Sequence, residues 1–245
     1  MRSYSGKVFC WREHWKRLLE SAHALGQIFV FSEGDARKWI ARLIQESGFR
    51  DSVLRFSVHW EPSASLGVSG AIVLMFREFK AYPEEIYRKG VTLRTGVPRR
   101  WNLKAQDSRI KVSQYTNGVL AVLDHLGTKA RELIFLNQDG YVAEGSVSNL
   151  FIVNGKRILT PCVGSGILKG VTHDVVIGLA RRRGWQVTET FLTRHEIYTA
   201  EECFMTNTSS EVLPVVEVDG RSIGNGKPGP VAKILRSDFK KAVGR

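Results

Sequence analysis

The chain has 245 residues, of which 43% are hydrophobic and 24% charged, and its formal net charge is +12. This length and composition are ordinary for a folded protein with a large core, and they exclude a mainly disordered or low-complexity chain. The three cysteines are far apart and odd in number, which argues against a disulfide framework and against a zinc site.

The first part of the chain shows two helical patterns followed by two strand patterns. Apolar side chains recur at helical spacing over residues 11–25 and again over residues 35–47. The apolar, β-branched runs at residues 52–60 and 71–79 predict paired strands joined by a turn-rich segment at residues 61–70. These patterns predict a small α+β lobe.

A connection to a second lobe is predicted where a short strand meets a proline and polar residues, over residues 91–109. We place the boundary near residue 105, which gives a small lobe over residues 1–105 and a larger lobe over residues 106–245.

The larger lobe alternates helices and strands irregularly. An Asn154–Gly155 pair between two apolar runs is typical of a hairpin. This order favours a mixed α+β sheet over a doubly wound parallel one. The predicted helices cover residues 113–126, 172–183 and 228–243, and the predicted strands lie within residues 133–145, 149–159, 188–192 and 203–207.

The positive charge bears on partners and location. Lys and Arg are scattered, with only small clusters at Arg99–Arg100 and Arg181–Arg183, and no groove-reading motif accompanies them. We therefore expect a small anionic ligand rather than nucleic acid. No apolar run is long enough to cross a bilayer and residues 1–15 lack a signal-peptide core, so we expect no membrane association and a cytoplasmic protein.

The most informative stretch is EGSVSNLFIVNGKRILTPCVGSGILKGVT, residues 144–172. A Glu at a strand end, an Asn five residues later, a Thr-Pro and a Gly-rich turn into a helix form a long ordered signature. It resembles the signature of the class IV aminotransferases, the fold type IV enzymes of pyridoxal 5′-phosphate (PLP). That family includes branched-chain and D-amino-acid aminotransferases and 4-amino-4-deoxychorismate lyase. The resemblance extends from about Ser5 to near the C-terminus, and implies a two-lobed α+β fold, bound PLP and a homodimer.

The resemblance assigns the catalytic lysine. In the family, a lysine upstream of the glutamate forms a Schiff base with PLP and then moves the substrate proton. Lys111 in RIKVSQYTNGVLA matches that place, with Lys104 and Lys129 as its nearest rivals. By itself Lys111 is typical of a solvated strand end. Glu144 would accept a hydrogen bond from the protonated pyridine nitrogen, although an isolated acid before Gly usually belongs to a turn.

A phosphate site is expected where residues 170–172 open a helix, because the dipole and unpaired amides of a helix start favour an anion. Val171 and Thr172 are the expected backbone donors. The alternative is a plain helix start with Thr172 as the N-cap.

The resemblance adds residues from other segments. Arg17 in EHWKRLLESA matches the family's EHxxRLxxSA segment, whose arginine binds phosphate. Thr208 in FMTNTSSEVLPV would place its hydroxyl on the phosphate, and Asn207 would line the substrate side. Leu168 would pack against the pyridine ring. Each polar residue could instead stabilise a turn, and Leu168 could be a core leucine.

The sequence also departs from the family pattern. The family's first strands and GDGxFET-like segment are missing, so we expect a lobe truncated at its start, by a misassigned start or by a real loss. SVHWEPSASLG, residues 57–67, replaces the RGxxxRxH-like segment of the D-amino-acid branch, which disfavours that substrate.

The spacing of Lys111 and Tyr115 resembles the D-amino-acid and lyase branches, whereas TNTSSEVLPV with Glu211 resembles a transaminase. Arg99 or Arg100 would receive a substrate carboxylate, or either is a solvated loop charge.

These residues predict a PLP-dependent aminotransferase that moves an amino group between an amino acid and a 2-oxo acid. One alternative is 4-amino-4-deoxychorismate lyase, which would use the same lysine and cofactor to release pyruvate. A third is a PLP-binding or basic interaction protein that has lost catalysis.

Overall fold

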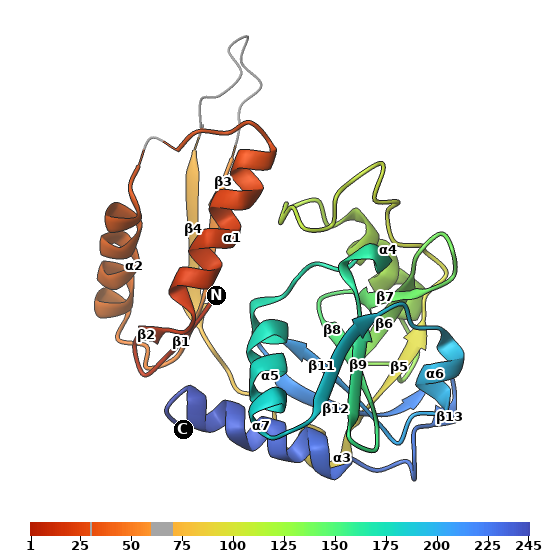
Figure 1. Cartoon of the computed structure of the whole chain (residues 1–245). Coiled ribbons are helices and arrows are strands. Elements are labelled where there is room, and N and C mark those ends of the chain that lie inside the picture. The colour runs from red at the N-terminus through yellow and green to blue at the C-terminus, as the bar shows by residue number, and fades with distance from the viewer. Residues whose placement is uncertain (30, 60–70) are drawn as a thin grey trace. The chain divides into compact units, whose positions relative to one another are not determined.

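The computed structural model describes residues 1–29, 31–59 and 71–245 (Figure 1). The chain forms two compact units. One comprises Met1–Ala81, Ile110–Ser113 and Gly244, and the other comprises Tyr82–Arg109, Gln114–Val243 and Arg245. These units differ from the predicted division near residue 105, because a strand at Val91–Thr95 belongs to the sheet of the larger unit.

The smaller unit is a four-stranded antiparallel sheet with two helices. The sheet has the order β2-β1-β3-β4. Its elements are β1 Arg2–Tyr4, β2 Lys7–Val8, α1 Trp11–Ala24, α2 Glu33–Ser47, β3 Ser52–Val58 and β4 Ile72–Glu78. Both predicted helices and both predicted strands are confirmed, and the predicted turn at residues 61–70 lies outside the described residues.

Aromatic packing holds this unit together. The rings of Trp11 and Trp15 stack with centroids 5.7 Å apart and pack with buried Ala36, Ile40 and Leu54. Large buried aromatic side chains supply much of the apolar area that stabilises a small core. The core therefore fixes helix α1, which carries Arg17, against the sheet.

The larger unit is built around a nine-stranded mixed sheet of order β10-β9-β8-β11-β12-β5-β6-β7, with β13 paired to β12. Three pairs are parallel, β9–β10, β12–β5 and β5–β6, and the others are antiparallel. This confirms the predicted mixed α+β sheet. The strands are β5 Val91–Thr95, β6 Glu132–Leu136, β7 Val142–Gly145, β8 Asn149–Asn154, β9 Arg157–Pro161, β10 Gln186–Thr190, β11 Glu202–Asn207, β12 Glu211–Val218 and β13 Arg221–Ser222.

Two long helices pack on strands β10, β11 and β12 of the larger sheet. Helix α5 packs on β10 and β11, and α7 packs on β11, β12 and α5 (Figure 1). The helices of this unit are α3 Glu84–Lys89, α4 Thr116–His125, α5 Val171–Arg182, α6 Arg194–Tyr198 and α7 Pro230–Ala242, with a short 3-10 turn at Val163–Ser165. Helix α4 is shorter than the predicted residues 113–126, and Lys111 precedes it in a segment without helix or strand.

Two other kinds of feature are absent from the described residues. No helix among residues 1–29, 31–59 and 71–245 is long and apolar enough to span a membrane. Those residues also contain no cluster of three or more His, Cys, Asp or Glu side chains placed to hold a metal ion. Cys10, Cys162 and Cys203 are free thiols.

Candidate active site

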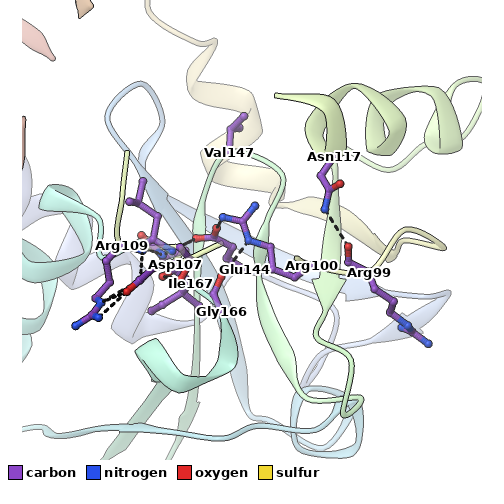
Figure 2. Close-up of polar contacts among 12 residues, drawn as sticks. Arg99, Arg100, Asp107, Arg109, Asn117, Glu144, Val147, Gly166 and Ile167 are labelled. Atoms are coloured by element: carbon purple, nitrogen blue, oxygen red, sulfur yellow. Dashed lines mark hydrogen bonds and ion pairs between the residues drawn. The ribbon is translucent and has the colours of Figure 1, made fainter. Parts of the chain in front are cut away.

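Glu144 is a buried carboxylate held by three donors. It lies at the end of β7 and is 7% exposed. Its Oε2 accepts from the Leu168 backbone N–H at 2.9 Å and from the Asn149 Nδ2 at 3.3 Å, and its Oε1 pairs with the Arg100 Nη2 at 2.7 Å (Figure 2). These contacts fix the plane of the carboxylate and the direction in which it accepts a proton donor.

Arg100 is committed to this carboxylate. Besides its pair with Glu144, its Nε donates to the Gly166 carbonyl at 3.0 Å, so one planar guanidinium joins the end of β7 to the Gly-rich turn. Figure 2 shows the side chain of Arg99 turned away from this group, and the Arg99 carbonyl accepts from the Asn117 Nδ2 at 2.9 Å. The structure therefore separates the two arginines that the sequence presented as equivalent carboxylate receptors.

Asn149 connects the parts of the signature. Its Nδ2 also donates to the Leu168 carbonyl at 2.9 Å. A Cβ placed on Gly170 would lie 2.3 Å from the Asn149 Oδ1, so only glycine fits at that position without displacing this amide. The role of Asn149 was not predicted from the sequence, where its spacing of five residues from Glu144 was the available signal.

Helix α5 opens directly beside this amide. Gly170 is its N-cap, with extended backbone and no side-chain cap, and Val171 and Thr172 are its first two residues, both buried. Thr172 is thus not the N-cap, and the alternative in which it caps the helix is wrong. The first-turn N–H groups of an uncapped helix start are donors suited to an anion. Leu168 contributes its backbone to the site, because its N–H donates to Glu144 and its carbonyl accepts from Asn149.

The turn at residues 206–210 lies next to Asn149 through strand pairing. Thr206 on β11 pairs with Asn149 on β8. The Asn207 Oδ1 accepts from the N–H groups of Ser209 at 2.8 Å and Ser210 at 2.7 Å, so Asn207 shapes the turn that presents half-buried Thr208. Among the described residues, the Thr206 Oγ1 and the Ser210 Oγ are buried without a hydrogen-bond partner. Orphaned hydroxyls of this kind usually face a ligand or water.

Glu132 supports the loop after Glu144. Its Oε1 accepts from the Val147 N–H at 2.7 Å and the Ser148 Oγ at 2.9 Å. Burial raises the pKa of Glu132, and these hydrogen bonds oppose the shift. A Cβ on Gly145 would lie 2.3 Å from the same Oε1, so glycine is needed beside the functional glutamate.

Lys111 and Arg17 belong to the smaller unit. The exposed residue Lys111 is fixed by its backbone, because its N–H donates to the Ser21 Oγ at 3.0 Å. The same hydroxyl donates to the Arg17 carbonyl at 2.8 Å, and Ser21 is 5% exposed. Ser21 therefore ties the lysine segment to helix α1. The sequence offered no signal for this link.

His14 completes this cluster. Its Nδ1 lies 3.5 Å from the Arg17 Nη2. Burial, followed by the positive charges of the Met1 amino group, Arg17 and Lys111, lowers the pKa of His14 to about 2. A neutral imidazole is thus the form that faces Arg17, and it is the form that can accept a hydrogen bond from a guanidinium.

The chain combines two units. One is a small α+β unit that carries Arg17 and the Lys111 segment, and the other has a mixed sheet with buried Glu144 beside the start of α5. This combination is that of a fold type IV enzyme. Residues 1–218 match the family Amino-transferase class IV. A branched-chain-amino-acid aminotransferase of Pseudomonas aeruginosa is 32% identical over 95% of this chain and 77% of the relative. A D-alanine aminotransferase of Bacillus licheniformis is 30% identical over 99% of this chain and 86% of the relative.

The solved structures agree. A branched-chain amino acid aminotransferase solved with pyridoxamine 5′-phosphate superimposes with a TM-score of 0.91 and 33% identity, covering 100% of this chain and 84% of that one. A branched-chain aminotransferase of Thermoproteus uzoniensis, solved with norvaline, superimposes with a TM-score of 0.88 and 29% identity, covering 99% of this chain and 84% of that one. The chain belongs to the class IV aminotransferase family, and it is an aminotransferase.

Proposed function

We propose that the chain uses PLP to exchange an amino group between an amino acid and a 2-oxo acid, with Lys111 as the lysine that attaches the cofactor. The observation that carries the proposal is buried Glu144, oriented by Arg100, Asn149 and Leu168 beside the open start of α5. This combination offers a fixed acceptor for a ring nitrogen next to donors for a phosphate.

The residues present fit PLP. Glu144 would hold the pyridine nitrogen and Leu168 would lie against the ring. The phosphate would be held by the N–H groups of Val171 and Thr172, the Thr208 hydroxyl and Arg17. The partnerless hydroxyls of Thr206 and Ser210 support an oxygen-rich group at the turn that carries Thr208. Asn207, which organises that turn, would line its substrate side.

The chemistry divides between the cofactor and the chain. When bound, PLP supplies an electron-accepting ring that stabilises negative charge at the substrate Cα. The Lys111 amine would move a proton between that Cα and the C4′ of the cofactor, in one direction in the first half-reaction and in the other direction in the second. Glu144 would keep the ring nitrogen protonated, and Arg100 would hold Glu144 in place. Arg100 would act through Glu144, so we do not assign it the substrate carboxylate.

For the substrate we propose branched-chain L-amino acids. The similar proteins include branched-chain aminotransferases, at 32% identity for that of Pseudomonas aeruginosa, as well as the D-alanine enzyme at 30%. The segment at residues 57–67 lacks the RGxxxRxH-like pattern of the D-amino-acid branch, which favours the first of these substrates. Residues 60–67 of that segment lie outside the described residues.

The cofactor assignment is tested by spectroscopy and chemical trapping. Protein incubated with PLP should gain a visible absorbance band that borohydride removes, and mass spectrometry should then find the reduced cofactor on Lys111. Lys111→Ala should show neither, whereas Lys104→Ala, which removes the nearest rival upstream, should show both. Labelling at another lysine would refute the role of Lys111.

The reaction is tested by three parallel assays. L-Leucine with 2-oxoglutarate should give glutamate, and D-alanine with 2-oxoglutarate should give little or none. Release of pyruvate from aminodeoxychorismate without amino transfer would replace the proposal with the lyase alternative. Cofactor binding without turnover of any substrate would identify a protein that has lost catalysis.

We also propose that the chain forms a homodimer through helix α4. Val119, Leu120, Val122 and Leu123 are all exposed on this short helix. An apolar patch of this kind is typical of a protein interface. Light scattering should give the mass of a dimer, and Leu120→Lys with Leu123→Lys should shift it toward the monomer, while Leu25→Lys, an exposed leucine in the smaller unit, should not. A monomeric parent protein would refute the proposal.

A further inference from the structure

The larger unit has a second hollow that the proposed active site does not use. It is an open cavity of about 1100 Å³ between β5, the loop before β6, the start of α6 and the turn between β12 and β13. This volume is in the range of small-molecule sites. None of the residues proposed to hold the cofactor lines it.

Five permanent cations from four separate segments line this hollow. They are Arg94, Arg99, Lys129, Arg194 and Arg221, and all five are exposed. The carboxylates in the lining are Glu217 and Asp219, so five positive and two negative charges leave a net charge of +3. None of the ion pairs among the described residues involves Arg94, Arg99 or Lys129. Clustered cations that outnumber the carboxylates in a concave surface concentrate an anion.

Asp219 is already satisfied by neutral donors. Its Oδ1 accepts from the Thr95 N–H at 2.6 Å, and its Oδ2 accepts from the Thr95 Oγ1 at 2.6 Å and the Tyr198 hydroxyl at 2.7 Å. These bonds tie β5, α6 and the β12–β13 turn together. The carboxylate thus joins the elements that frame the hollow, and it also interacts electrostatically with Arg194.

The orientation of two of these cations, Arg221 and Arg99, can be described. The Arg221 guanidinium stacks on the Tyr198 ring at 4.6 Å from its centroid, and its Nη1 donates to the Asp219 carbonyl at 3.2 Å. The Arg99 side chain points away from the Glu144 group, as Figure 2 shows. Arginine forks suit phosphate oxygens because they donate two parallel hydrogen bonds.

We propose that this hollow binds a small molecule that carries at least two phosphate groups. Each phosphate group carries a charge of about −1.5 to −2 at neutral pH, so two of them balance the net charge of +3. A single carboxylate or monophosphate would leave cations without partners. The site is independent of the cofactor site and of the amino-transfer reaction.

The test is calorimetric titration of inorganic pyrophosphate into protein first saturated with PLP and dialysed, so that the cofactor phosphate cannot be mistaken for this site. The parent should bind pyrophosphate at one site per chain, and orthophosphate should bind at least about fivefold more weakly at matched ionic strength. Arg94→Ala with Lys129→Ala should weaken pyrophosphate binding by about fivefold or more, since the double variant lacks two of the five cations that line the hollow.

A matched pair of substitutions separates a site from general surface charge. Lys156→Ala with Arg157→Ala removes two exposed cations from the turn before β9 and from its first position, outside the hollow, and should leave pyrophosphate binding unchanged. Equal weakening in both double variants would overturn the proposal, as would the absence of saturable binding to the parent. Orthophosphate binding as tight as that of pyrophosphate would overturn the requirement for two phosphates.

Discussion

Arg100 is a residue whose role could be assigned only from the folded chain. It lies 44 positions before Glu144, and the sequence offers no periodicity or motif that joins the two. In the structure its guanidinium bridges the Glu144 carboxylate and the Gly166 carbonyl. The sequence offered Arg99 or Arg100 either as a receptor for the substrate carboxylate or as a solvated loop charge, because an arginine in a loop reveals its charge and not its partner.

Replacement of Arg100 should weaken the hold on the cofactor ring. Arg100→Met removes a charged hydrogen bond from a buried carboxylate, an interaction worth about 1.5 kcal/mol or more, so PLP should bind about tenfold more weakly. Absorbance titration of the apoprotein measures this. Arg157→Met, an exposed arginine at the start of β9, serves as the control. Unchanged PLP affinity in Arg100→Met would contradict the bridging role.

Ser21 offers a second test at the scale of one atom. Ser21→Ala leaves the Lys111 N–H without its acceptor, so the lysine segment should become less ordered and the unit should lose about 1 kcal/mol of stability. The rate of borohydride-trapped PLP attachment to Lys111 should fall. Ser47→Ala is the matched control, because that hydroxyl also bridges two backbone groups of the same unit, away from Lys111. Equal labelling rates in the two variants would show that Ser21 stabilises without positioning.

Among the elements, length decided what could be predicted. Helices α1, α2, α5 and α7 each span three or more turns, so their apolar periodicity identified them within about two residues. Strands of five or six residues such as β6, β8 and β11 were indicated by their apolar composition, whereas the short elements β1, β2, α3 and α6 show no period and were not predicted. They still matter, because α6 supplies Tyr198 to the Asp219 framework.

The start of α5 is the element on which the phosphate proposal depends. Gly170→Ala keeps an allowed backbone, since Gly170 has a φ of −74°, but it places a methyl 2.3 Å from the Asn149 Oδ1. Asn149 must then move away from Leu168 and Glu144. We expect PLP affinity to fall about tenfold or more, which corresponds to the loss of one charged hydrogen bond.

Another glycine of the same helix provides the comparison. Gly178→Ala meets only the end of the Arg182 side chain at 3.6 Å, so it should raise the free energy of unfolding by about 0.5 to 1 kcal/mol through helix propensity. Thermal unfolding and PLP titration of both variants give the contrast. Equal PLP affinity in Gly170→Ala and Gly178→Ala would show that a Cβ at residue 170 does not displace Asn149 from its contacts.

At the scale of the whole molecule, the succession of helical and strand patterns correctly indicated a mixed α+β protein, whereas the order of the strands could not be predicted. Strand β5 pairs in parallel with β12, so that Val91 lies opposite Val215. Pairings between segments so distant in sequence depend on the closure of the entire sheet and leave no local signal. The same limit applies to the basic hollow, whose cations come from four segments that meet only in the folded sheet.

The pH dependence of stability should report the buried histidine of the smaller unit. The pKa of His14 is lowered from 6.5 to about 2 in the folded chain, with the Met1 amino group, Arg17 and Lys111 facing it. Between these values the unfolded chain binds a proton that the folded chain does not, so stability rises with pH and is lost as pH falls below about 6.5. From pH 6.5 to 5.5 the loss of stability from this group should be about 1 kcal/mol.

Denaturant unfolding measures this loss. The free energy of unfolding of His14→Gln should fall less steeply over that interval than that of the parent. His23→Gln, which replaces an exposed histidine on the same helix, should fall as the parent does. If the slopes of His14→Gln and the parent coincide, His14 takes up its proton in the folded state and cannot be the neutral partner of Arg17.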